Sequence, residues 1–106
     1  MAKYLLQTSY VGEGVQGLLK EGGTSRRAVA EEAVKSVGGT LEAFYFAFGP
    51  TDVYLIVDVP DNVSMAALAL AVSASGLVKA TTTVLLTPEE IDQAVQKKPW
   101  YRPPGQ

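Results

Sequence analysis

The chain has 106 residues, of which 47% are hydrophobic and 19% charged, and this size and composition predict a single folded domain with its own hydrophobic core. Its 9 basic and 11 acidic residues give a net charge of −2 without a dominant block, which argues against nucleic acids and anionic membranes as partners. Cysteine and histidine are both absent, so disulfides, thiolate or imidazole catalysis and the usual zinc sites are excluded.

The first half of the chain is predicted to contain a strand, two helices and a hairpin. The spacing of its apolar residues places these elements, in order, at residues 3–10, 13–21, about 24–37, 40–48 and 53–59. Thr24 or Ser25 is the expected cap of the second helix, and Gly38-Gly39 supplies its left-handed stop. The composition of residues 49–52 (Gly-Pro-Thr-Asp) is typical of a turn between two strands.

The second half is predicted to add a helix, a strand, another helix and a tail, at about residues 62–75, 79–86, 88–96 and 97–106. Asp61 is the expected N-cap of the first helix, which is apolar nearly all round and therefore must be covered on more than one side. Residues 87–90 (Thr-Pro-Glu-Glu) match a capping box with proline at the first helical position. The proline-rich tail is expected to be extended, with Trp100 and Tyr101 docked rather than left in water.

This order predicts a ferredoxin-like βαββαβ fold of the α+β class, with a four-stranded antiparallel sheet, helices on one face, and an extra C-terminal helix and extended tail. We expect one ferredoxin-like domain over residues 1–96 and a proline-rich tail over residues 97–106. The first residues lack the apolar segment of a signal peptide, and the most apolar stretch, residues 65–72, is too short to span a bilayer. We therefore expect a cytoplasmic protein.

The predicted hairpin has two largely apolar faces. A turn with an even number of residues pairs residue 48 with 53, 46 with 55, and 44 with 57. The face expected to lie under the helices then carries Phe44, Phe46, Phe48, Val53, Leu55 and Val57, and the opposite face carries Ala43, Tyr45, Ala47, Tyr54, Ile56 and Asp58. Because one βαββαβ unit covers a single face of its sheet, we expect a second copy of the chain to cover the other. The result is a dimeric α/β barrel, or a multiple of such dimers, with a cavity between the sheets.

Several short segments together resemble the GYD-domain family of small bacterial and archaeal proteins. They are Tyr4, Gly14, Gly38-Gly39, Phe44-Tyr45, Gly49-Pro50-Thr51-Asp52, Pro60-Asp61, Ala67-Leu68-Ala69-Leu70 and Thr87-Pro88-Glu89-Glu90. The resemblance covers roughly residues 2–96 and implies a ferredoxin-like fold of the dimeric α/β-barrel kind, without an established activity. The chain departs from the name-giving Gly-x-Tyr-Asp motif, since threonine stands at position 51. A role that depends on the tyrosine ring therefore does not carry over.

Five residues are candidates for a ligand site at the covered face of the sheet: Tyr45, Tyr54, Asp52, Arg26 and Gln7. The two tyrosines are either hydrogen-bond donors or a general acid in a cleft, or plain interface aromatics. Asp52 presents a carboxylate at the rim or caps backbone N–H groups of its own turn. Arg26 lies in the first turn of a helix, where the helix dipole disfavours a cation, so it marks an anion site, pairs with Glu31 or Glu32, or is simply solvated. Gln7 points into the cavity if that side of its strand faces inward.

The sequence leaves three functions open. The first is a binding protein whose cavity holds a small organic molecule, either anionic or neutral. The second is a cofactor-independent enzyme of the isomerase, lyase or monooxygenase type, in which Tyr, Asp and Arg side chains replace histidine. The third is a structural assembly protein. We expect no metal and no cofactor, because carboxylates do not cluster at ligand spacing and the ligands of haem and iron–sulfur centres are missing.

Overall fold

The computed structural model describes residues 2–106. Its elements are, in chain order, β1 (Ala2–Tyr10), α1 (Gly14–Glu21), α2 (Gly23–Ser36), β2 (Thr40–Phe46), β3 (Val53–Val59), α3 (Asn62–Ala74), β4 (Val78–Leu85) and α4 (Pro88–Gln96). None of the helices in this part of the chain is long and apolar enough to cross a membrane.

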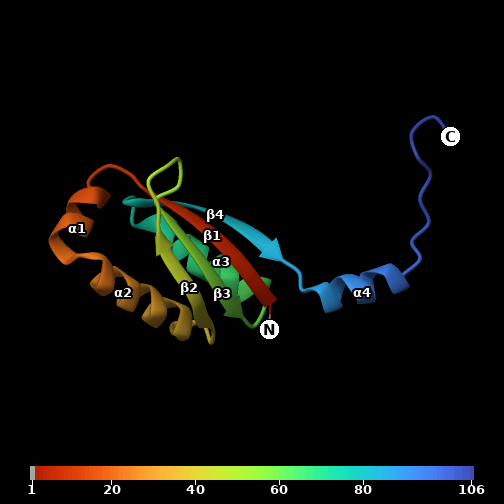
Figure 1. Ribbon diagram of the computed structural model, residues 1–106, viewed down its shortest axis with the longest axis horizontal. Coiled ribbons are helices and arrows are strands. Elements are labelled where there is room, and N and C mark those ends of the chain that lie inside the picture. The colour runs from red at the N-terminus through yellow and green to blue at the C-terminus, as the bar shows by residue number, and fades with distance from the viewer. Residues whose placement is uncertain (1) are drawn as a thin grey trace.

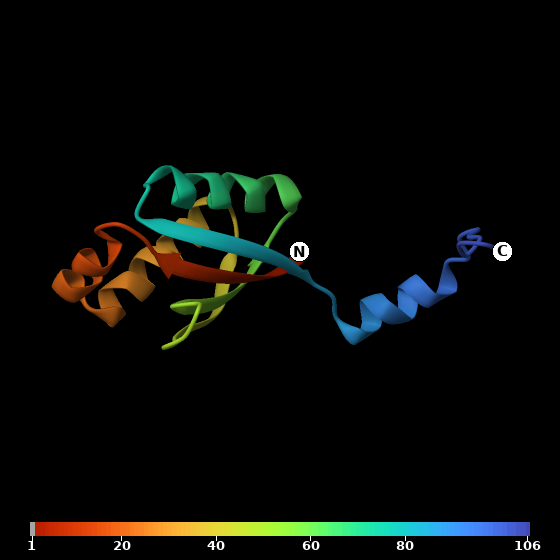
Figure 2. The ribbon, with the colours of Figure 1, turned by 90° about the horizontal axis from the view of Figure 1, so that it is seen from above.

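The four strands form one antiparallel sheet in the order β2-β3-β1-β4. Helices α2 and α3 pack on one face of this sheet, and α4 leads away from it (Figure 1 and Figure 2). This arrangement confirms the predicted α+β, ferredoxin-like fold with helices on one face and an extra C-terminal helix. Pairing with a second copy stays a prediction.

The core lies between the sheet and the two helices, and its members follow the pleat of the strands. The buried residues are Tyr4, Leu6, Val34, Val53, Leu55, Val57, Val59, Met65 and Leu68. Successive side chains of a strand point to opposite faces, so the odd-numbered residues of β1 and the even-numbered residues of β3 face away from the helices. The buried phenol of Tyr4 is not left unpaired, because its hydroxyl donates to the Asn62 side chain.

Two glycines make the tight connection between α2 and β2 possible. Gly38 has a φ of +82°, a left-handed backbone conformation that residues other than glycine rarely adopt. A Cβ on Gly39 would lie 2.6 Å from both the carbonyl oxygen of Asp58 and the Cγ1 of Val59. The predicted stop of this helix is therefore confirmed, and it also brings β2 against β3.

The pairing of β2 with β3 is offset by two residues from the predicted one. The observed partners are Phe46 with Val53, Phe44 with Leu55 and, beyond a bulge, Leu41 with Val57. The strand ends at Phe46 because residues 47–52 form a wider loop, which the N–H of Ala47 closes by donating to the Asp52 carbonyl at 2.8 Å. An offset of two leaves the faces of both strands unchanged. Phe48, predicted to lie under the helices, is instead in the loop and fully exposed.

The start of α2 also differs from the prediction. The cap position is Gly22, without a side-chain hydrogen bond, and Thr24 and Ser25 already lie inside the helix. The backbone comes so close to the ring of Phe46 that a Cβ on Gly23 would lie 2.9 Å from it. This helix therefore begins without a capping hydroxyl and packs closely on the sheet at its first residue.

The C-terminal segment projects from the domain. Helix α4 and the tail extend the molecule along its longest axis, which measures 57 Å (Figure 1). The radius of gyration is 16.9 Å, against roughly 13 Å for a compact chain of this length. Trp100 is 85% exposed and Tyr101 71% exposed, so neither docks on its own domain, and docking on a neighbouring copy stays a prediction.

Candidate functional site

The face of the sheet opposite the helices carries a row of four polar side chains, one from each strand. Tyr45 of β2 pairs with Tyr54 of β3, Tyr54 with Gln7 of β1, and Gln7 with Thr81 of β4. Directly paired residues hold their side chains about 5 Å apart on the same face. The row therefore places two phenols, an amide and a hydroxyl side by side across this face of the sheet.

An apolar row lies beside the polar one. It consists of Ala43, Ile56 and Leu5, and the hydroxyl-bearing Thr83 ends it on β4; these residues are also direct partners across the four strands. Leu5 and Ile56 are only half-buried, although they lie in the middle of the sheet. Tyr45 is 71% exposed. We refer to this surface as the open face, because α2 and α3 cover only the opposite one.

Charged side chains flank the two rows. At one end Lys3 binds Asp58 at 3.1 Å and also pairs with Glu42. The hydrogen bonds from its ammonium to Glu42 and to Asp58 raise the pKa of Lys3 above its ordinary 10.5. At the other end Lys79, the partner of Ser9, is exposed and forms no ion pair within residues 2–106. A cation that can accept an anionic group thus lies next to the polar row.

Three of the five candidate residues predicted from the sequence lie on the open face. Tyr45, Tyr54 and Gln7 share the polar row, and the structure shows that the odd-numbered side of β1 faces away from the helices. Thr81 and Lys79 were missed, although the alternation along β4 would have placed them on one face once its partner strand was known. No three carboxylates within residues 2–106 lie close enough to hold a metal ion.

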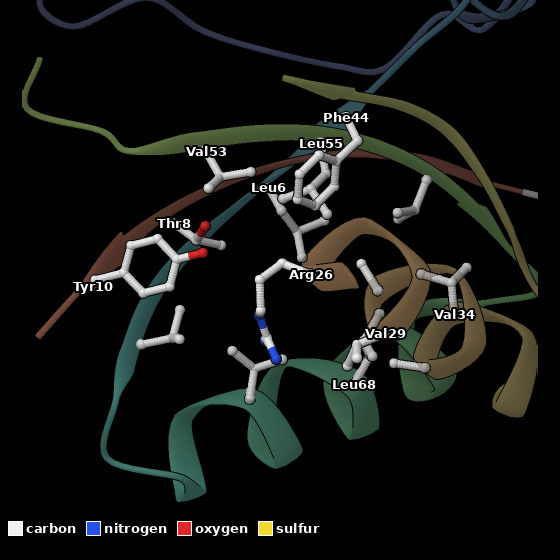
Figure 3. Close-up of a pocket in the computed structure, with 15 residues that line it drawn as sticks. Leu6, Thr8, Tyr10, Arg26, Val29, Val34, Phe44, Val53, Leu55 and Leu68 are labelled. Atoms are coloured by element: carbon white, nitrogen blue, oxygen red, sulfur yellow. The ribbon is translucent and has the colours of Figure 1, made fainter. Parts of the chain in front are cut away.

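Arg26 lies on the other side of the sheet. Its side chain borders a partly open pocket of about 120 Å³ that is lined by α2, α3 and the helix-covered face of the sheet (Figure 3). The sheet itself separates this guanidinium from the tyrosines of the open face. The five candidates therefore do not form one site.

The sequence profile of the GYD domain matches residues 4–95. The chain belongs to the GYD family. Comparisons with curated proteins and with solved structures gave no match. Family membership therefore supports the fold and leaves the function to be argued from the geometry of the site.

The loop of residues 49–52 is bound to the end of β1. The carboxylate of Asp52 accepts a hydrogen bond from the backbone N–H of Tyr10 at 2.8 Å, and its own N–H donates to the Thr8 carbonyl at 2.9 Å. The hydroxyl of Ser9 adds a bond to the carbonyl of Pro50 at 3.0 Å. Asp52 thus has a clear structural task, and its carboxylate does not join the polar row.

Proposed function

We propose that this GYD protein is a homodimer, or a multiple of dimers, that binds a small organic molecule between the open faces of two sheets. The single observation that carries the proposal is the row of Tyr45, Tyr54 and Gln7 beside half-buried apolar residues on a surface that α2 and α3 leave uncovered. A two-fold axis brings the same surface of two chains together. Each sheet then covers the apolar row of the other.

The polar row gives this interface its binding capacity. Hydroxyl and amide groups that become buried between two sheets need hydrogen-bond partners. The phenol rings of Tyr45 and Tyr54 offer flat apolar contact, while Gln7 supplies both a donor and an acceptor. Lys79 adds a positive charge at the end of the row. This combination fits a small ring compound that carries hydroxyl, carbonyl or acidic groups.

Light scattering coupled to gel filtration tests the assembly. At micromolar protein we expect at least twice the chain mass of 11.2 kDa. The substitution Ile56→Lys places a charge in the apolar row and should dissociate or unfold the protein, because a buried unpaired ammonium is costly. Leu19→Lys, at an exposed position of α1, is the matched control and should leave the mass unchanged. A cooperatively folded wild-type protein of one chain mass would refute the proposal.

Binding is tested by thermal shift with phenols, hydroxylated carboxylates and their neutral counterparts. A ligand of the folded state raises the melting temperature with the logarithm of its concentration. Tyr45→Phe and Tyr54→Phe retain the rings and remove the hydroxyls, so they should weaken any such ligand without changing the oligomer. Ligands that bind both variants as tightly as wild type would place the binding site elsewhere.

A further inference from the structure

The pocket between the helices and the sheet has the size and the walls of a small-molecule site. Its volume is about 120 Å³, which is somewhat less than the roughly 150 Å³ of an engineered apolar cavity that binds benzene. Most of its walls are aliphatic or aromatic, contributed by Leu6, Val29, Ala30, Ala33, Val34, Phe44, Val53, Leu55, Val57, Leu68, Val72 and Val78. Because the pocket is partly open to solvent, the apolar part of a small ring or branched compound can enter it while its polar group stays at the opening.

Three polar side chains complete the lining. Thr8 and Tyr10 come from the last part of β1, and Arg26 comes from the first turns of α2. Figure 3 shows Thr8 and Tyr10 together on one side of the pocket, while Phe44 and Val34 lie toward the other. Arg26 is the only charged residue among the pocket-lining residues. The pocket is therefore amphipathic, with one cation and two hydroxyls in otherwise apolar walls.

The setting of Arg26 differs from that of its neighbour on the same helix. The side chain of Arg26 is 31% exposed and borders the pocket, whereas that of Arg27 is 57% exposed and pairs with Glu31. The partner of Arg26 is Glu21 of α1, at 3.3 Å and on an exposed side chain. A guanidinium beside apolar walls favours an anion that binds it through two oxygens. Since Glu21 can return to water, it is a replaceable partner.

We propose that this pocket binds a small monocarboxylate with a ring or a branched apolar body. The carboxylate pairs with Arg26 in place of Glu21, the hydroxyls of Thr8 and Tyr10 donate to it, and the apolar body fills the space between α2 and α3. One cation matches one negative charge, which favours a carboxylate over a phosphate. The site is independent of the one proposed on the open face, because the sheet lies between them.

Titration calorimetry with the full chain and benzoate as the probe tests the proposal, with 3-methylbutanoate as the aliphatic counterpart. Benzamide, which has the same shape without the charge, should bind at least tenfold more weakly than benzoate. Arg26→Gln should weaken benzoate binding at least tenfold. Arg27→Gln is the matched control and should bind as wild type does. Glu21→Gln should tighten binding, because it removes the competing carboxylate, and a merely structural role of Arg26 would not have this effect.

Chemical-shift mapping of benzoate locates the bound molecule without relying on any variant. We expect the methyl groups of Ala30, Ala33 and Val72 to shift, and the resonances of Tyr45 and Tyr54 to stay in place. Shifts confined to the open face, equal affinity of wild type and Arg26→Gln, or absence of binding at millimolar benzoate would each overturn the proposal. None of these outcomes would affect the dimer test at Ile56.

Discussion

The hydrogen bond between Asp52 and β1 leads to a prediction about the stability of the domain. Asp52→Ala removes the carboxylate that accepts the backbone N–H of Tyr10 at 2.8 Å. The other two contacts of this residue, to Thr8 and to Ala47, use its backbone atoms and survive the substitution. The change therefore isolates one side-chain hydrogen bond at the base of the loop.

The magnitude follows from the kind of bond that is lost. A hydrogen bond to a charged group contributes about 1.5–3 kcal/mol, and Tyr10 is only half-buried, so water partly replaces the acceptor. We expect Asp52→Ala to lower the free energy of unfolding by about 2 kcal/mol. For a domain of this size that corresponds to a melting temperature lower by roughly 8 °C. Asp52→Asn retains an acceptor without the charge and should lose about half as much.

Urea unfolding followed by circular dichroism, at one fixed protein concentration, measures these differences. Asp92→Ala is the control, because it removes an equal charge from an exposed position of α4, and it should change stability by less than about 0.5 kcal/mol. The reasoning is wrong if Asp52→Ala is as stable as this control. It is also wrong if Asp52→Asn is no more stable than Asp52→Ala, since the acceptor would then be irrelevant.

Three further predictions concern two glycines, the Asp61 helix cap and the C-terminal tail. Gly39→Ala should destabilise the protein by about 2 kcal/mol, because the added methyl group overpacks the site. Gly17→Ala should stabilise it by about 0.5–1 kcal/mol, because Gly17 lies on a helix with open space around it. The urea midpoints of both variants measure these differences. The backbone N–H at the start of α3 lowers the pKa of the Asp61 cap below its ordinary 3.8, so its stabilising effect is present above that pH and is lost as pH falls through the folded-state value. The melting temperature of Asp61→Ala should therefore lie below wild type at pH 7 and converge with it in stronger acid. Truncation after Gln96 should reduce oligomer mass or melting temperature, and emission of a fully hydrated indole from Trp100 in the intact oligomer would contradict docking of the tail.

Local signals in the sequence were sufficient for most of the fold. The glycine pair at 38–39, the Asp61 cap and the capping box at Thr87 act within a few residues of chain, and the structure contains all three. Alternation of apolar residues along β3 separated its two faces correctly, because the side-chain period of a strand is two whatever its partner is. Apart from Ala47 and Phe48, which lie in the loop after β2, the prediction of the faces is therefore correct despite an error of two residues in the β2–β3 pairing.

The grouping of the candidate residues was decided only by tertiary structure. Tyr54 and Gln7 lie far apart in the chain and meet because β1 pairs with β3 rather than with β2. Arg26 is separated from them because α2 packs on the other face of the sheet. It lies there beside a pocket that distant segments of the chain form together, so local sequence patterns do not predict it. By itself, the sequence determined which elements form and which side chains share a face, since these depend on local periodicity and capping. The order of strands and the packing of helices determined which of those faces meet, because they depend on contacts between distant segments.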